Sequence, residues 1–244
     1  MIKTFIKDTF RKAGYEIINT KKPAQSDYET DKKFHDRYNL AQEKCQMVST
    51  DNALRRQRHY TLNYLLWSAK LDQGDVCELG CWRGLSAYQI AAHCRSLPSD
   101  IAFHIFDSFE GLSEYQSVDV PEGNQHDLDQ RRKHFACALE IVKDNLKEFS
   151  FIEYHKGWIP ERFHQVADRQ FSFVHVDVDL YQPIYDSFEF FYPRLVKHGI
   201  MVFDDYGCTQ FPGAKKAIDE CLKKHDNPFF VPLPSQQAFL IKDF

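Results

Sequence analysis

Apolar and polar positions follow a regular order along most of the chain, in which short apolar runs alternate with amphipathic stretches. The apolar runs are nearly continuous, as is typical of strands buried on both faces of a parallel sheet. The order of strand and helix predicts an α/β fold with a doubly wound, Rossmann-like sheet. The strands predicted from these runs are residues 76–80, 102–107, 151–157, 171–179 and 199–205.

Two further apolar runs near the end of the chain depart from this order. Residues 229–234 and 238–242 are separated only by Ser235 to Gln237. A parallel return needs a crossover of a dozen or more residues, so we expect an antiparallel hairpin. The predicted sheet then has seven strands, five parallel and two in the C-terminal hairpin.

Apolar residues at helical spacing predict the helices between these strands. The clearest is 184–196, where Ile184, Phe188, Phe191 and Leu195 share one face and Gly199 lies just beyond the expected end. The other predicted helices are residues 51–71, 85–94, 161–167 and 213–224.

Residues 1–46 are predicted to form an N-terminal helical extension to a main domain at 47–244. Residues 2–18 have an amphipathic pattern, and we expect this helix to pack on its own domain or on a second subunit, which would make the protein a homo-oligomer. A membrane surface is the less favoured alternative for it. Residues 21–37 are polar and are predicted to be a linker or mobile lid.

Residues 109–150 are predicted to be an insertion after the second strand. The segment begins with polar residues and continues as one helix with Phe135, Leu139, Val142 and Leu146 on one stripe. An excursion of this length after the second strand would lie at the edge of a ligand crevice. We therefore expect it to form a lid or a wall of the substrate site.

Composition narrows the classes of function. The chain has 244 residues, a net charge of -4 and a pI near 6.3, so it lacks the basic surface of a nucleic-acid binder and no such partner is expected. Its seven scattered cysteines include no CxxC pair and indicate reduced thiols. No run approaches the roughly 18 apolar residues of a membrane span, and the N-terminus lacks a secretory pattern. We expect a cytoplasmic protein.

A glycine turn follows the first predicted strand and carries Glu78, Gly80 and Gly84. Glycine lets a ligand approach the backbone at the start of a helix. The spacing is ExGxxxG rather than the GxGxxG of a pyrophosphate site, and Asp107 ends the next strand, where a carboxylate can accept hydrogen bonds from ribose hydroxyls. This favours a nucleoside cofactor without a pyrophosphate over a βα turn with no ligand.

Four acidic residues follow the last two parallel strands. Asp177 and Asp179 share a side of one strand end, and Asp204 and Asp205 end the next strand. Three of these carboxylates could hold Mg²⁺ or a similar hard divalent cation, leaving the fourth as a general base. Isolated aspartates at strand ends commonly cap helices, but four converging ones indicate a metal site.

The eleven histidines show no HxH or HExxH spacing. His104 and His175 lie inside apolar strands, and we interpret both as core residues rather than as ligands or bases.

Several segments, taken together and in order, resemble the macrocin O-methyltransferase family. They are VCELGCWRG, HIFDSFEGL, KGWIPE, HVDVDLYQPIYDSFEFFYPRLV, FDDYG and PGAKKAIDE, and the similarity runs from about residue 47 to residue 222. Members of this family are class I S-adenosylmethionine-dependent enzymes that methylate sugar hydroxyls on antibiotics and related glycans. The resemblance implies the same fold, with a small-molecule or glycan acceptor.

Site roles follow from the resemblance. It implies that Asp179 is the general base that accepts the proton of the sugar hydroxyl. The implied Mg²⁺ ligands are Asp177, Asp204 and Asp205. The residues implied for S-adenosylmethionine are Glu78, Gly80 and Gly84 along its methionine and ribose, and Asp107 at the ribose hydroxyls. The N-terminal 46 residues and the insertion match the family only loosely, and these are regions where such enzymes choose substrates.

Two alternatives remain open at this point. Acidic residues at two strand ends also occur in phosphohydrolases of the haloacid dehalogenase type, but that interpretation leaves Glu78, Gly84 and Asp107 unexplained. A non-catalytic nucleoside-binding subunit is the second alternative. The chain has all four acidic residues, which argues against a subunit without catalytic activity.

Overall fold

The computed structural model describes residues 27–97, 101–121, 128–225 and 228–243. The chain divides into two compact units, residues 1–35 and residues 36–244. The predicted helix at 2–18 lies outside the described residues. The described part of the predicted linker contains α2 (Asp27–Thr30) and the start of α3 (Lys32–Lys44). Asp31 lies between the two helices and caps α3, because its side chain accepts a hydrogen bond from the Phe34 N–H at 2.9 Å.

The second unit contains a seven-stranded sheet in the order β3-β2-β1-β4-β5-β7-β6. Strands β1 to β5 are parallel, whereas β7 runs antiparallel to both β5 and β6. The mostly parallel sheet and its C-terminal hairpin are therefore confirmed. The strands are β1 (Asp75–Leu79), β2 (Phe103–Asp107), β3 (Ile152–Lys156), β4 (Phe171–Val176), β5 (Leu195–Phe203), β6 (Phe229–Pro232) and β7 (Ala238–Ile241).

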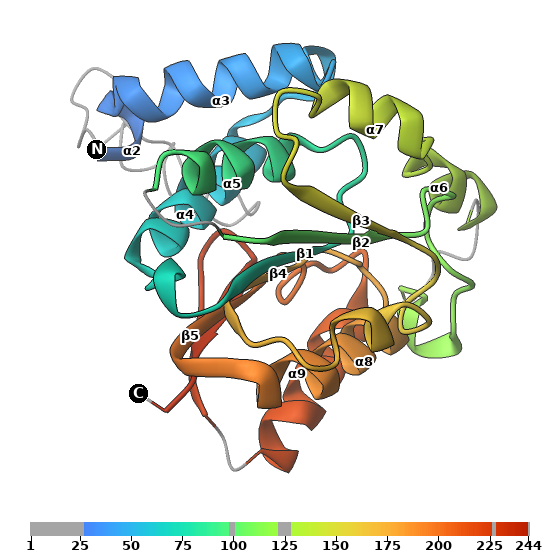
Figure 1. Ribbon diagram of the computed structural model, residues 1–244. Helices are drawn as coiled ribbons and strands as arrows, with labels where there is room; N and C mark the ends of the chain where they lie inside the picture. Colours follow the sequence, from blue (N-terminus) through green and yellow to red (C-terminus); the bar gives the residue numbers. More distant parts are fainter. Residues whose placement is uncertain (1–26, 98–100, 122–127, 226–227, 244) are drawn as a thin grey trace, which may run out of the picture. The chain divides into compact units, whose positions relative to one another are not determined.

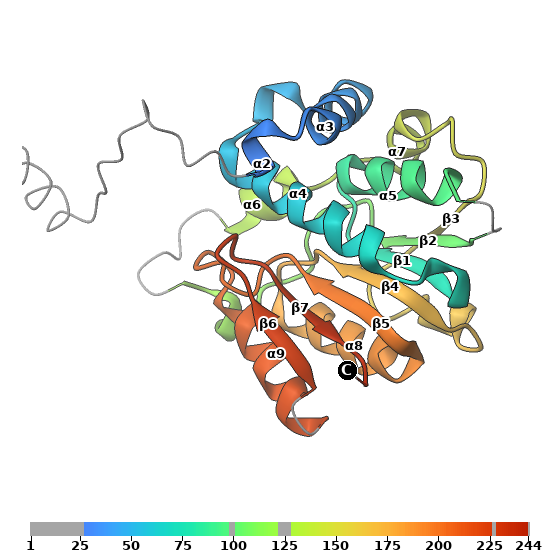
Figure 2. The same ribbon diagram turned by 90° about the vertical axis from the view of Figure 1, so that its left-hand side faces the viewer.

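Helices cover both faces of the sheet, with α4, α5 and α7 on one face and α8 and α9 on the other (Figures 1 and 2). Among the described residues, no helix is long and apolar enough to cross a membrane. The α-helices of this unit after α3 are α4 (Ala53–Ser68), α5 (Leu85–Arg95), α6 (Leu128–His134), α7 (Leu139–Asn145), α8 (Tyr181–Phe191) and α9 (Pro212–Lys224). The 3₁₀ helices are η1 (Val48–Thr50), η2 (Leu71–Gln73), η3 (Ser117–Asp119), η4 (Phe163–Val166) and η5 (Tyr192–Arg194).

Strand β4 lies at the centre of the sheet, and all six of its side chains are buried. On the α8 face, Phe106 of β2 meets Phe163 edge-on with ring centroids 5.3 Å apart, and Phe191 of α8 meets Phe171 at 4.9 Å. Edge-to-face contacts of this kind add to the free energy gained by apolar burial. This packing holds the strand ends that carry the site in fixed positions.

Helix α8 ends earlier than the sequence predicts. Pro193, which has no N–H group, is the second residue of η5, and the Leu195 N–H donates to the Tyr192 carbonyl, so β5 starts at Leu195. Phe171 of β4 pairs with Leu195, and Phe173 pairs with Ile200. Between these two pairs β5 therefore has three residues more than β4, and the register is irregular there. The prediction of a helix to Val196 is therefore wrong, because the proline terminates it.

Two other predicted helices also differ. The stretch at 161–167 contains only the short 3₁₀ helix η4. The single helix predicted within the insertion is two helices, α6 and α7. The Arg132 carbonyl near the end of α6 accepts a hydrogen bond from the Leu112 N–H at 3.2 Å, so this tertiary contact takes the place of helix continuation.

Candidate active site

A cleft with a volume of about 370 Å³ opens at the carboxyl ends of the parallel strands. Its lining includes Gly80 after β1, Asp107 at the end of β2, Asp177 after β4 and Asp204 after β5. Ligands of open α/β sheets bind at this edge, and the volume is within the range of small-molecule sites. The insertion contributes residues 111–113 and Phe135 to the wall, as predicted.

The two predicted glycines have different structural roles. Gly80 lines the cleft with φ +80°, and a Cβ atom there would overlap the carbonyl oxygen of Asp177. Gly84 has φ +90° and precedes the first residue of α5, where a Cβ would lie 3.3 Å from a side-chain carbon of Leu146. Only glycine adopts both conformations without strain. Gly80 therefore brings the glycine turn close to the acidic turn, whereas Gly84 shapes the start of the helix.

Asp107 holds the glycine turn in place. Its carboxylate accepts hydrogen bonds from the backbone N–H groups of Cys81 at 2.8 Å, Trp82 at 3.3 Å and Phe109 at 2.7 Å. Burial raises the pKa of Asp107, and these hydrogen bonds oppose that shift. A contact between Asp107 and ribose hydroxyls stays a prediction, since each carboxylate oxygen can accept more than one hydrogen bond.

Glu78 lies beneath the cleft on β1 and is fully buried. One carboxylate oxygen is 2.9 Å from Nδ1 of His175, and the other, Oε2, has no hydrogen-bond partner among the described residues. His175 is also 3.8 Å from Asp204 through Nε2. Although burial alone would lower it, the carboxylates of Asp204 and Glu78 raise the pKa of His175 to about 10. His175 is a buried core residue, as predicted, and it lies between the carboxylates of Glu78 and Asp204.

Three of the four predicted acidic residues form a tight group. Asp177, Asp179 and Asp205 each place one carboxylate oxygen within 4.8 Å of those of the other two. Burial and the charges of neighbouring carboxylates, including Asp204, raise the pKa of Asp177 and Asp179 well above the usual range, and that of Asp205 to about 7. Within the described part of the chain, the Oδ2 atom of Asp205 is buried without a hydrogen-bond partner. A cation between these carboxylates would relieve both the repulsion and the missing contact.

Asp204 lies beside this group and has partners of its own. Its Oδ2 accepts from Nη1 of Arg58 at 2.8 Å, and its Oδ1 accepts from Nε2 of Gln237 at 2.7 Å. Although burial opposes the shift, His175 and Arg58 lower the pKa of Asp204. The same Nη1 atom is 3.9 Å from Asp205, so a positively charged group already contacts both adjacent carboxylates.

Arg58 belongs to the site, although the sequence analysis does not single it out. It lies on α4 four residues before Leu62 and eight before Leu66, both of which are buried. A charged residue on the buried stripe of an amphipathic helix is the signal that could have identified it. Its guanidinium approaches the end of β5 from a helix 146 residues earlier in the chain.

Asp119 of the insertion is a second residue that the sequence analysis does not single out. Its Oδ1 accepts from the Tyr181 N–H at 2.7 Å, and its Oδ2 accepts from the Gln116 N–H at 2.9 Å. Tyr181 is the first residue of α8 and lies two positions after Asp179. Asp119 therefore ties the insertion to the turn that carries the acidic residues.

We expect Asp119→Ala to lower the free energy of unfolding by about 1–3 kcal/mol, because it removes a buried carboxylate that accepts two backbone hydrogen bonds, from the N–H groups of Gln116 and Tyr181. Urea denaturation measures this change. Asp144→Ala, at an exposed position of α7, is the matched control and should change stability by no more than about 0.5 kcal/mol. Equal effects of the two substitutions would contradict the clamping role of Asp119.

Comparison with solved structures places this fold among the O-methyltransferases. The calicheamicin methyltransferase CalS11 superposes with a TM-score of 0.65 at 20% identity, covering 91% of this chain and 95% of that one. The O-methyltransferase NovP gives a TM-score of 0.63 at 22% identity over 77% of this chain and 80% of that one. The fold is therefore that of class I methyltransferases.

Sequence comparison gives the family. A model of the macrocin O-methyltransferase (TylF) family matches residues 15–228, and the chain belongs to this family. It is 28% identical over 154 residues to 8-demethyl-8-(2,3-dimethoxy-alpha-L-rhamnosyl)-tetracenomycin-C 4'-O-methyltransferase of Streptomyces olivaceus, covering 61% of this chain and 55% of the relative. It is 25% identical over 158 residues to demethyldecarbamoylnovobiocin O-methyltransferase of Streptomyces niveus, covering 63% and 60%. The matched part thus spans less than two thirds of either relative. The phosphohydrolase alternative gains no support from these comparisons.

Proposed function

We propose that the protein transfers a methyl group from S-adenosylmethionine to a hydroxyl of a sugar, in a glycan or glycosylated natural product, with the help of Mg²⁺ or a similar hard cation. The single observation that carries this proposal is the gathering of four carboxylates beside a glycine turn in one cleft. Membership of the macrocin O-methyltransferase family supports the reaction. The rhamnosyl group in the name of one relative supports a sugar acceptor.

For the cofactor, we propose that its methionine and ribose lie along the glycine turn. Gly80 brings the backbone to the cleft, and Gly84 directly precedes α5, whose N-terminal end favours a carboxylate. Asp107 would meet the ribose hydroxyls. Glu78 would contact the cofactor from beneath the cleft, since its buried Oε2 atom has no hydrogen-bond partner within the described residues. A group without a partner at this depth is costly unless a ligand or an ordered water completes it.

For the metal, we propose Asp177, Asp204 and Asp205 as ligands. The residues fit a hard cation because their donors are carboxylate oxygens and Oδ2 of Asp205 has no partner. The guanidinium of Arg58 contacts both Asp204 and Asp205, which supports a preference of these two carboxylates for a positively charged neighbour. A bound cation would favour the deprotonated form of an acceptor hydroxyl.

For the general base, we propose Asp179. The residue is buried, and its backbone adopts φ +59°, a conformation uncommon outside glycine. Burial and the neighbouring carboxylates raise its pKa, which makes it a better proton acceptor than an exposed aspartate. Asp179 would accept the hydroxyl proton while the acceptor oxygen bonds to the methyl carbon and the carbon–sulfur bond breaks.

The test of this function is methyl transfer by the purified full chain from labelled S-adenosylmethionine to glycosides with a free rhamnose hydroxyl. We expect transfer with added Mg²⁺ and a loss of about 100-fold or more after chelation with EDTA, restored by Mg²⁺, since a catalytic metal contributes several kcal/mol. Transfer that is insensitive to EDTA would reject the metal. Binding of S-adenosylmethionine without transfer to any glycoside would favour the nucleoside-binding alternative.

A further inference from the structure

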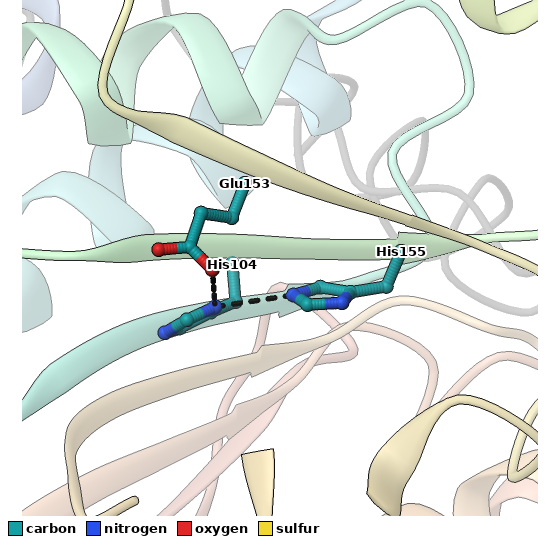
Figure 3. A group of neighbouring side chains, drawn as sticks. All are labelled: His104, Glu153 and His155. Atoms are coloured by element: carbon teal, nitrogen blue, oxygen red, sulfur yellow. Dashed lines mark hydrogen bonds and ion pairs between the residues drawn. The ribbon is translucent and has the colours of Figure 1, made fainter. Parts of the chain in front are cut away.

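A second group of side chains with metal-ligand chemistry lies on the neighbouring strands β2 and β3 (Figure 3). His104 and Glu153 are register partners, and His155 follows two positions after Glu153 on the same face. Nδ1 of His104 is 3.1 Å from Nε2 of His155 and 3.4 Å from a carboxylate oxygen of Glu153. All three are separate from the residues that line the cleft in the described part of the chain.

The outer hydrogen bonds of the two rings determine which nitrogens carry protons. Nδ1 of His155 is 2.6 Å from the Gln165 side-chain oxygen, so it donates and Nε2 keeps its lone pair. Nε2 of His104 is 3.2 Å from the carboxylate of Asp75, which also accepts from Arg169 at 2.6 Å. A carboxylate only accepts, so Nε2 of His104 donates, and in the neutral ring Nδ1 keeps its lone pair; a second proton on Nδ1 would instead be donated to His155 or Glu153.

With both rings neutral, two nitrogen lone pairs therefore face each other at 3.1 Å beside a carboxylate. Either a shared proton or a metal cation resolves this contact. Tetrahedral Zn²⁺ with bonds of about 2.0–2.1 Å separates its ligand atoms by about 3.3–3.4 Å. The distances of 3.1 Å and 3.4 Å from Nδ1 of His104 are close to that value.

The surroundings also correspond to those of a metal centre. Ligating histidines commonly donate their second N–H to a carboxylate or amide oxygen, as His104 does to Asp75 and His155 to Gln165. Imidazole nitrogens favour Zn²⁺ over Mg²⁺. The side chain of Glu153 is 57% exposed, whereas that of His104 is 2% exposed, so an ion here would have solvent on one side for a fourth ligand.

We propose that His104, Glu153 and His155 bind Zn²⁺ or a similar d-block divalent cation, which joins the edge strand β3 to β2. The site is chemically distinct from the aspartate group, and it does not rest on the proposed methyl transfer. His104 lies three residues before Asp107 in β2, or about 10 Å along an extended strand, so the ion would act on structure rather than on the reaction.

The test is titration of the metal-free full chain with Co²⁺, whose visible absorption reports tetrahedral nitrogen and oxygen ligands, followed by displacement with Zn²⁺, in excess Mg²⁺. We expect one such site in the wild-type protein. Glu153→Ala removes an exposed ligand with little risk to folding and should weaken Zn²⁺ binding about tenfold or more. His155→Ala should abolish the absorption, and Glu140→Ala, at an exposed position of α7, should leave the affinity unchanged.

Three results would overturn the proposal. The first is wild-type affinity for Zn²⁺ in Glu153→Ala. The second is loss of the Co²⁺ absorption in Asp205→Asn but not in His155→Ala, which would locate the ion among the aspartates. The third is the absence of Co²⁺ and Zn²⁺ binding by the wild-type chain, which would mean that a shared proton holds the two histidines together.

Discussion

Asp179→Asn is expected to lower kcat for methyl transfer by about 10²–10⁴-fold, the usual contribution of a general base. The amide keeps the size of the side chain but cannot accept the proton of the acceptor hydroxyl. Asp179 lies in the turn after β4, whereas the proposed cofactor contacts lie in and just after β1 and at the end of β2. The affinity for S-adenosylmethionine, measured by calorimetry, should therefore change little.

Asp204→Asn is the matched control, because it separates the role of base from the role of metal ligand. If Asp204 is the third ligand, Asp204→Asn weakens Mg²⁺ binding and Asp179→Asn does not. If Asp179→Asn weakens Mg²⁺ binding and Asp204→Asn does not, Asp179 is the third metal ligand. The grouping of Asp177, Asp179 and Asp205 would produce that result. Near wild-type turnover in Asp179→Asn would remove this residue from catalysis altogether.

The hydrophobic pattern was sufficient to predict the sheet because burial decides it directly. Strand β4 is buried along its whole length, so its sequence is one continuous apolar run. The hairpin of β6 and β7 followed from the length of the connection alone, since the three residues between the two predicted runs cannot form a parallel crossover. These features depend on local sequence and simple geometry.

Helix ends and helix type were harder to predict because tertiary contacts decide them. The stripe from Ile184 to Leu195 has helical spacing, yet Pro193 ends the helix and Leu195 enters β5. The apolar stripe of the insertion likewise continues across a break, which is stabilised by the contact between Leu112 and Arg132. Periodicity reports which side chains are buried, and the same burial can be reached by different backbone paths.

The candidate site was also predictable only in part, because strand ends follow from local sequence and contacts between distant residues do not. Strand ends place Asp177, Asp179 and Asp205 together, because adjacent parallel strands end at one edge of the sheet. Asp204 differs from them in its hydrogen-bond partners, because Arg58 on α4 donates a hydrogen bond to its carboxylate. No spacing rule connects residues so distant in the chain. The sequence therefore locates the acidic group but does not divide the roles within it.

Gly80→Ala is expected to have the largest effect on stability, lowering the free energy of unfolding by about 3 kcal/mol or more. The new Cβ would overlap the carbonyl oxygen of Asp177, a backbone atom that cannot rotate away, and φ +80° is itself strained for alanine. Close approach is required here because the Gly80 N–H donates to Phe106 at 2.8 Å and the Asp177 N–H donates to Leu79 at 2.8 Å. Urea denaturation of the two proteins measures the difference.

Gly84→Ala is the matched control, since its φ of +90° is equally unusual but the new Cβ would meet only the flexible side chain of Leu146 at 3.3 Å. We expect a loss of about 1–2 kcal/mol, mostly from backbone strain. Insoluble Gly80→Ala beside folded Gly84→Ala would agree with this expectation, whereas equal stabilities would contradict it. The comparison isolates the contact between Gly80 and Asp177, which fixes the distance between the glycine turn and the acidic turn. Because one backbone contact fixes that distance, any shift at Gly80 that the chain survives should weaken S-adenosylmethionine binding and Mg²⁺ binding together.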